Sequence, residues 1–164
     1  MTEQSYSRSW LAPSTQNPIA ATVSLPGSKS LNNRELVLSA LAIEPTELTQ
    51  TLESRDSTLM IQALRQLGTE IQVSGTTVVV TPKPLHGPAS IDCGLAGTVM
   101  RFVPPLATLA VGQINFDGDA QARKRPMRTT VESLRSLGVE VVGDGLPFSI
   151  QGTGEVLGGE IEID

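Results

Sequence analysis

Two hydrophobic spacings alternate along the chain, one typical of helices and the other typical of strands. Apolar residues recur every three or four positions in some segments. In shorter segments bounded by turn residues they alternate with polar residues. The segments expected to be helices are 28–43, 56–67, 97–110 and 126–137. The segments expected to be strands are 22–25, 46–52, 70–74, 76–81, 89–92, 112–117, 139–142 and 148–151. This order predicts a mixed α/β (α+β) fold.

The order of these elements repeats along the chain. The phrase LRQLGTEI at 64–71 returns as LRSLGVEV at 134–141, and in both places a glycine ends an amphipathic helix before paired strands. We interpret the chain as two βαβαββ units, at 22–81 and 89–151, with the start of a third unit at 158–164. Chance similarity is the alternative, because this helix ending is common, but the matching flanking elements favour a repeat.

The repeat also suggests how the chain divides. We interpret residues 1–21 as a leader with a first strand and hinge, and they contain no apolar signal core that would predict export. Residues 22–164 would form one incomplete domain, because a unit that stopped after one strand would leave that strand without a covering helix. We therefore expect a truncated chain, the N-terminal portion of a longer protein.

Composition and charge exclude several classes of protein. The chain is 39% hydrophobic but only 3% aromatic, so its core must be aliphatic, and no apolar run is long enough to span a bilayer. The single cysteine, Cys93, excludes an internal disulfide and suits a reducing compartment. A net charge of −5 disfavours nonspecific binding to nucleic acid. We expect a cytoplasmic protein that binds neither nucleic acid nor membrane.

Most basic residues nevertheless gather in three short segments. Seven of the twelve lysines and arginines are Lys29, Arg34, Arg101, Arg123, Lys124, Arg125 and Arg128. Local positive sites on an acidic protein indicate small anionic ligands.

The first segment is PGSKS at 26–30, directly before a helix. It lacks the glycine spacing of a phosphate-binding P-loop. A helix N-terminus still offers free N–H groups, while Lys29 adds a charge and Ser30 a hydroxyl. Arg34, one turn later, can make a bidentate contact to a carboxylate or phosphate. The alternative is an ordinary capped helix with both cations in solvent.

A second feature of this helix is the stripe formed by Ser30, Arg34, Val37 and Leu41. Helical spacing assigns this stripe to the core side. A serine and an arginine are unusual at the start of such a stripe.

The second segment is CGLAGTVMR at 93–101, in which small residues would let a ligand approach the backbone. Arg101 lies one turn into the following helix, as Arg34 does in the first unit. The alternative is a tight turn, with Arg101 in a structural ion pair. Pro104 and Pro105 predict that this helix is kinked or restarts.

The third segment is ARKRPMR at 122–128, where Pro126 suits the first position of a helix. Three cations ahead of a helix are poorly placed for its dipole unless an anion binds there. A solvated charge run is the alternative.

Other candidates carry little signal. His86 has no cysteine or histidine cluster around it, which disfavours a zinc site. Cys93 is better explained as a small packed residue than as a nucleophile. Asp117 and Asp119 could bind a metal, but two acids beside a loop are too common to support one.

Taken together, the basic motifs resemble those of the EPSP synthase family. The motifs that carry the resemblance are LPGSKS at 25–30, Asn33-Arg34, AGTVMR at 96–101 and Arg125-Pro126. They occur in the family's order with similar spacing, from about residue 10 onwards. Many family members have Asn and Pro where this chain has Leu95 and Phe102.

The resemblance implies an activity and a fold. The family transfers the enolpyruvyl group of phosphoenolpyruvate to the 5-hydroxyl of shikimate 3-phosphate and releases phosphate, without a metal or organic cofactor. Its fold, an inside-out α/β barrel, has two domains of three βαβαββ units each. The active site lies in the cleft between the domains. The full-length enzyme would be a monomer.

The resemblance also implies substrate contacts within an incomplete substrate-binding domain. Shikimate 3-phosphate would be held by Lys29, Ser30 and Arg34. Phosphoenolpyruvate would be held by Lys29, Gly97 and Arg125. Further candidates near that pocket are Thr98 and Arg101. The helical stripe would begin with Ser30 and Arg34 because this end of the helix faces a ligand cleft.

No catalytic residue is assigned within this chain, because the family's proton-transferring residues lie in the second domain. The partners are therefore small anionic substrates and the rest of the protein, and we expect this chain alone to be inactive. Two alternatives are open: a UDP-N-acetylglucosamine enolpyruvyl transferase, which shares the fold, and a non-catalytic phosphate-binding module. A phosphotransferase is disfavoured because the P-loop is absent.

Overall fold

The computed structural model describes residues 10–23, 25 and 27–161. Their helices are α1 (Lys29–Ala40), α2 (Arg55–Gln66), α3 (Gly97–Ala107) and α4 (Arg128–Ser136). Their strands are β1 (Thr46–Leu48), β2 (Glu70–Ser74), β3 (Thr77–Thr81), β4 (Ala89–Asp92), β5 (Val111–Asp117), β6 (Glu140–Val142) and β7 (Phe148–Thr153). The predicted mixed α/β fold is confirmed.

The strands form two sheets. One has the order β1-β3-β2 and is antiparallel throughout. The other has the order β4-β5-β7-β6, in which β4 and β5 are parallel and the remaining pairs are antiparallel. The connection from β4 through α3 to β5 is the crossover that a parallel pair requires.

The elements β4, α3, β5, α4, β6 and β7 follow one another in the βαβαββ order expected of the second unit. The first unit lacks its opening strand among the described residues: 22, 23 and 25 are exposed and pair with no strand. The expected start of a third unit is likewise absent at 158–161, while 162–164 lie outside the described residues. In both places a short alternating pattern predicted a strand, but a strand also needs a hydrogen-bonding neighbour.

The repeated phrase ends its helices as predicted. Gly68 and Gly138, which follow α2 and α4, have φ values of 101° and 83°. This left-handed conformation is easily adopted by glycine, and it turns the chain from the helix into the next strand.

Several boundaries differ from the predictions. β1 ends at Leu48 rather than at residue 52, and Gln50 in this stretch has a φ of 56°, which a strand cannot accommodate. α4 begins at Arg128, so Pro126 precedes the helix instead of opening it. α3 neither restarts at Pro104 and Pro105 nor continues to residue 110: both prolines lie inside one helix that ends at Ala107.

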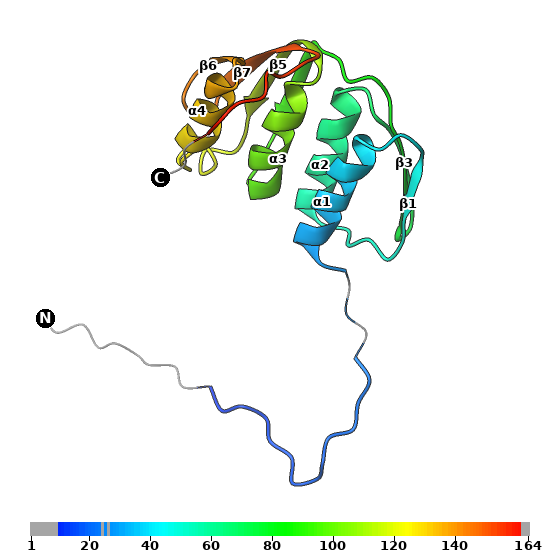
Figure 1. Cartoon of the computed structure of the whole chain (residues 1–164). Coiled ribbons are helices and arrows are strands. Elements are labelled where there is room, and N and C mark those ends of the chain that lie inside the picture. The colour runs from blue at the N-terminus through cyan, green and yellow to red at the C-terminus, as the bar shows by residue number, and fades with distance from the viewer. Residues whose placement is uncertain (1–9, 24, 26, 162–164) are drawn as a thin grey trace, which may run out of the picture.

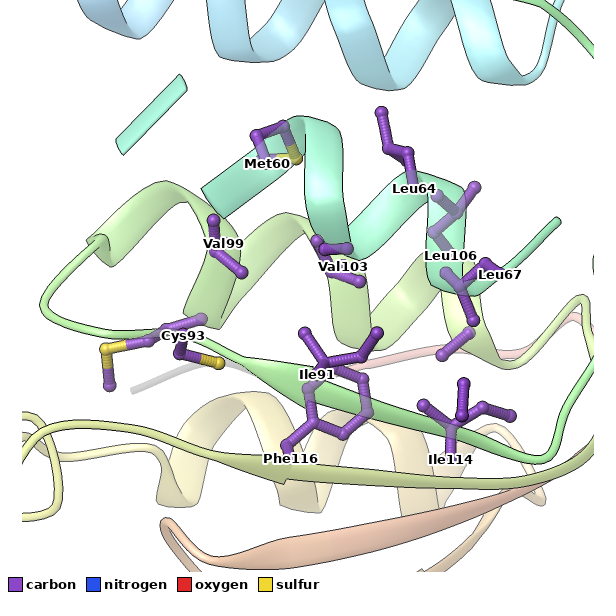
Figure 2. Close-up of a cluster of buried hydrophobic side chains, with 14 of the residues drawn as sticks. Met60, Leu64, Leu67, Ile91, Cys93, Val99, Val103, Leu106, Ile114 and Phe116 are labelled. Carbon is purple, nitrogen blue, oxygen red and sulfur yellow. The ribbon is translucent and has the colours of Figure 1, made fainter. Parts of the chain in front are cut away.

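The core is mainly aliphatic, as the composition predicts, and its buried residues come from the helices and from both sheets. Figure 2 shows side chains from α2, α3, β4 and β5 meeting in one cluster. Its labelled members are Met60, Leu64, Leu67, Ile91, Cys93, Val99, Val103, Leu106, Ile114 and Phe116. This packing fixes α2 and α3 against the sheet and against each other.

α1 packs with a different face from the one that its spacing predicts. Its buried residues are Asn32, Asn33, Leu36, Ser39 and Ala40. The predicted core stripe is therefore wrong: Ser30, Arg34 and Leu41 are exposed and Val37 is half-buried. Apolar spacing chose the wrong face because the first half of α1 packs through asparagines, against the polar first turns of α2 and α3.

A search of the described residues finds no helix with the length and apolar character needed to cross a membrane.

Candidate functional site

The N-terminal ends of α1, α2 and α3 meet at one end of the helical layer. The three helices lie side by side in Figure 1. Lys29 Nζ of α1 lies 3.0 Å from Asp56 Oδ2 of α2. Asn33 Nδ2 of α1 donates a hydrogen bond of 2.6 Å to Thr98 Oγ1 of α3. Two of the three basic segments therefore lie on one surface, although they are far apart in the sequence.

The starts of these helices differ in how their backbone N–H groups are satisfied. α2 has a capping box in which Ser54 and Ser57 each accept a hydrogen bond from the other's backbone N–H. Ser28 occupies the cap position of α1, but its side chain makes no capping bond, and Ala96 at the start of α3 has no group to do so. The first turns of α1 and α3 therefore present free donors and a partial positive charge to an anion.

The cations of α1 have different partners. Lys29 forms an ion pair with Asp56, and its side chain is 50% exposed against 23% for the aspartate. Arg34 Nη1 donates to the backbone oxygen of Ser30 at 3.3 Å, and the guanidinium lies 5.5 Å from the ring centroid of Phe102 on α3. Among the described residues no carboxylate pairs with Arg34, so its charge remains available to a ligand.

Gly97 lies within a second group of cations. A methyl group built on this glycine would come 3.4 Å from Arg101 Nη1 and 3.6 Å from Arg125 Nη1. Arg125 Nη1 also donates to the backbone oxygen of Leu95 at 2.8 Å, and Arg101 Nη1 donates to that of Gly97 at 3.5 Å. Two guanidinium groups thus flank the uncapped start of α3.

The third basic segment is divided between different partners. Arg125 turns back to the loop before α3, whereas Arg123 makes a two-point ion pair with Asp117, through Nε at 2.9 Å and Nη2 at 2.7 Å. Arg128 pairs with Glu132 one turn along α4. The sequence grouped these cations at the start of one helix, but only Arg125 lies at the start of α3.

A bidentate ion pair attaches the loop after β5 to α2. Arg55 Nη1 and Nη2 donate to Asp119 Oδ2 and Oδ1 at 2.8 and 3.0 Å. This hydrogen bond lowers the pKa of Asp119, and the corresponding bond from Arg123, with the backbone N–H of Gly118, lowers the pKa of Asp117. Both carboxylates are therefore engaged with arginine, which explains them without a metal. A cavity of about 750 Å³ beside them lies on the polar face of the four-stranded sheet.

Cys93 is a packed residue, as its sequence context indicates. It is buried in the core cluster, and burial, with further contributions from Asp92 and Asp117, raises the pKa of its thiol to about 12. A thiol with this pKa is protonated near neutral pH and is a poor nucleophile. In the described part of the chain, no three His, Cys, Asp or Glu side chains are grouped as a metal site would require.

The structure therefore gathers the candidate residues at one end of α1 and α3. The candidates on α1 are Lys29, Ser30 and Arg34. Those at α3 are Gly97, Thr98, Arg101 and Arg125. Sequence reasoning missed the contacts of Asn33 and Phe102, which join these two groups, and the ion pair of Arg55 with the loop after β5. Each contact links segments that are distant in sequence, and no local pattern marks it.

This arrangement suits the binding of small anions. The uncapped starts of α1 and α3 offer free backbone N–H groups. The cations of α1 and those beside the start of α3 lie on the same surface. Fixed donors and charges of this kind stabilise negative charge with little reorganisation.

Comparisons with known proteins agree on one family. The family model described as EPSP synthase (3-phosphoshikimate 1-carboxyvinyltransferase) matches residues 13–164. A 3-phosphoshikimate 1-carboxyvinyltransferase of Mycobacterium ulcerans (strain Agy99) is 51% identical over 160 residues, which is 94% of this chain and 37% of the relative. The protein of that name from Kocuria rhizophila is 50% identical over 169 residues, covering 94% of this chain and 38% of the relative.

Solved structures give the same result. The EPSP synthase from Acinetobacter baumannii superposes with a TM-score of 0.75 at 29% identity, covering 82% of this chain and 32% of that one. A second structure of EPSP synthase from that organism gives a TM-score of 0.73 at 29% identity, over 79% and 31% of the two chains. The chain spans 37% and 38% of the length of the two curated relatives.

Proposed function

Because the chain belongs to the EPSP synthase family, we propose that its protein transfers the enolpyruvyl group of phosphoenolpyruvate to the 5-hydroxyl of shikimate 3-phosphate and releases phosphate. The chain would contribute part of the substrate site. The observation that carries this proposal is the convergence of two uncapped helix starts with Arg34, Arg101 and Arg125.

The proposed contacts follow the two groups of cations. Shikimate 3-phosphate is held by Lys29, Ser30 and Arg34. Phosphoenolpyruvate is held by Lys29, Gly97 and Arg125. Thr98 and Arg101 are further candidates beside the phosphoenolpyruvate pocket. The absence of a side chain at Gly97 supports its role, because a Cβ there would occupy space beside both arginine Nη1 atoms.

Charge is the physical reason for this composition. Both substrates carry phosphate, and two unit charges about 4 Å apart repel each other by about 4 kcal/mol at the effective dielectric of a protein surface. Arginines and helix N-termini offset this repulsion while the two substrates are held in contact. The ion pair between Lys29 and Asp56 sets the position of the lysine before substrate arrives.

We further propose that residues 22–164 belong to one substrate-binding domain that works with a second domain of the same protein. The partial coverage of the relatives supports this division. Acid–base groups would come from that second domain, so the chain alone binds substrate weakly and does not turn over. We also propose that the whole protein is a cytoplasmic monomer and that it uses no metal or organic cofactor.

Phosphate release tests the proposal. The experiment supplies phosphoenolpyruvate and shikimate 3-phosphate to two samples. One is the protein expressed with all the sequence that its gene encodes, and the other is the 164-residue chain. We expect steady release of phosphate from the former and none from the latter. Release with UDP-N-acetylglucosamine in place of shikimate 3-phosphate would instead assign the sister activity. Steady turnover by the 164-residue chain would contradict the division into two contributing domains.

A further inference from the structure

One polar side chain at the junction of the helices is fully buried. Asn33 of α1 is 0% exposed, and its Nδ2 donates to Thr98 Oγ1 of α3 at 2.6 Å and to the backbone oxygen of Asp56 in α2 at 3.4 Å. Its Oδ1 has no hydrogen-bond partner within the described residues. A buried amide that is only partly satisfied costs folding free energy, so its place here calls for a reason other than stability.

The neighbours of this hydrogen bond supply that reason. On α1, Asn33 directly precedes Arg34 and lies one turn after Lys29. On α3, Thr98 directly follows Gly97. The bond therefore joins the helix turn that carries the α1 cations to the first turn of α3. A shift of one helix along the other would change the distance between these two groups.

A second contact joins the same helices at the rim of this junction. The guanidinium of Arg34 lies over the ring of Phe102, which follows Thr98 by one turn on α3. Asn33 and Arg34 are consecutive on α1, and they contact Thr98 and Phe102, which are one turn apart on α3. The hydrogen bond and the cation–π contact therefore fix the same relative position of the two helices.

We propose that Asn33 and Thr98 are positioning residues, whose hydrogen bond sets the spacing between the two substrate-binding groups. This inference rests on the proposed function and extends it. Neither side chain needs to touch a substrate for this role. The hydroxyl of Thr98 accepts the amide proton and thereby holds the first turn of α3, with Gly97, in register with Lys29 and Arg34.

α3 provides a matched control at its other end. Thr108 is 2% exposed, and its Oγ1 donates to the backbone oxygen of Pro105 at 2.6 Å. Thr108→Val and Thr98→Val each remove one threonine hydroxyl and its hydrogen bond, the first at the C-terminal cap of α3 and the second in its first turn. Only the bond of Thr98 joins α3 to α1.

The test measures KM for both substrates, together with the thermal midpoint, in the protein expressed with all the sequence that its gene encodes. We expect Thr98→Val to raise the KM values about fivefold, and Thr98→Ser, which keeps the hydroxyl, to recover most of this loss. Thr108→Val lowers the thermal midpoint without raising the KM values. Thr98→Ala removes the same hydroxyl and leaves a smaller side chain. If the valine variant does not fold, the KM values of Thr98→Ala test the same prediction.

Two outcomes would overturn the inference. Unchanged KM values in Thr98→Val or Thr98→Ala would contradict the positioning role. Equal increases of KM in Thr98→Val and Thr108→Val would show that the bond contributes only to general stability. Failure of the proposed function itself is distinguishable, because the wild-type protein would then release no phosphate from the two substrates.

Discussion

Arg125 and Lys124 are adjacent cations with different surroundings. Arg125 turns back to the start of α3, where its Nη1 donates to the backbone oxygen of Leu95 and lies beside Gly97. Lys124 is exposed on the same loop. The sequence grouped the two in one basic run, and the structure separates a cation of the candidate site from one in solvent.

This difference predicts the effect of removing each charge. Arg125→Ala should weaken phosphoenolpyruvate binding by about 10- to 100-fold, because a hydrogen-bonded contact to a charged group contributes about 1.5–3 kcal/mol. Lys124→Ala, its neighbour, should leave binding nearly unchanged. Steady-state KM values for phosphoenolpyruvate in the two variants measure this. Equal losses in both would show that only the overall charge of the loop matters.

Phe102 provides a second prediction for single residues. Its ring supports the guanidinium of Arg34, and exposed cation–π contacts contribute about 0.5–1 kcal/mol. Phe102→Leu keeps an apolar side chain but removes the ring's charge distribution. We expect the dissociation constant for shikimate 3-phosphate to rise by about two- to fivefold, as measured by titration calorimetry. A Phe102→Tyr variant, which keeps the ring, serves as the control and should bind like wild type.

At the scale of elements, the starts of the helices divide into capped and uncapped ones. The side chain of Ser54 accepts a hydrogen bond from the backbone N–H of Ser57 and completes a capping box, whereas Ser28 makes no capping bond. The same residue type at the same helix position therefore stabilises α2 and leaves the start of α1 open.

Ser54→Ala should lower the free energy of unfolding by about 1 kcal/mol. Ser28→Ala should change it by only a few tenths of a kcal/mol, because no side-chain bond is lost. Urea denaturation of the two variants beside wild type gives both values. A Ser28→Ala loss as large as that of Ser54→Ala would mean that α1 is capped in solution.

The ion pairs that hold the loop after β5 predict a pH dependence. Hydrogen bonds from Arg55 and Arg123 lower the folded-state pKa values of Asp119 and Asp117 below the ordinary value of 3.8. Their contribution to stability is therefore present above this value, and it is lost as the pH falls through the lowered pKa values.

Asp119→Asn removes one of these titrations. We expect its free energy of unfolding to fall less than that of wild type between about pH 6 and about pH 3, as measured by urea denaturation across that range. Identical slopes for the two proteins would show that Arg55 does not hold Asp119 in solution.

The sequence predicted the elements better than their contacts. The phrases ending at Gly68 and Gly138 identified the helix ends, because glycine's backbone freedom is a local property. The positive φ of Gln50 and the position of Pro126 outside α4 were missed, because neither residue type requires these conformations. The buried face of α1 was also missed, since Asn32 and Asn33 are polar and lie inside only because of their neighbours.

The same distinction applies to the site. Lys29, Arg34 and Arg125 could be chosen as candidates from motifs, but the contact between Asn33 and Thr98 could not, because the two residues are 65 positions apart in the sequence. Only the packing of α1 against α3 brings them together.

At the scale of the whole molecule, the described residues bring cations and two uncapped helix starts together, and the chain spans 37% of its Mycobacterium ulcerans relative. We therefore expect the chain to bind substrate without turnover. The helix starts and arginines are already assembled in the described residues, whereas the proton-transferring groups are proposed to lie in the second domain. Binding and catalysis should separate when the chain is studied by itself.

The most direct test is an amide NMR titration of the isotope-labelled 164-residue chain with shikimate 3-phosphate. We expect saturable chemical-shift changes concentrated at the first turns of α1 and α3, including the amides of Lys29, Ser30 and Gly97. The start of α2, whose N–H groups are capped by Ser54, should move much less. Shifts that avoid α1 and α3, or their absence from a well-dispersed spectrum, would contradict the claim that these two helix starts form the substrate site.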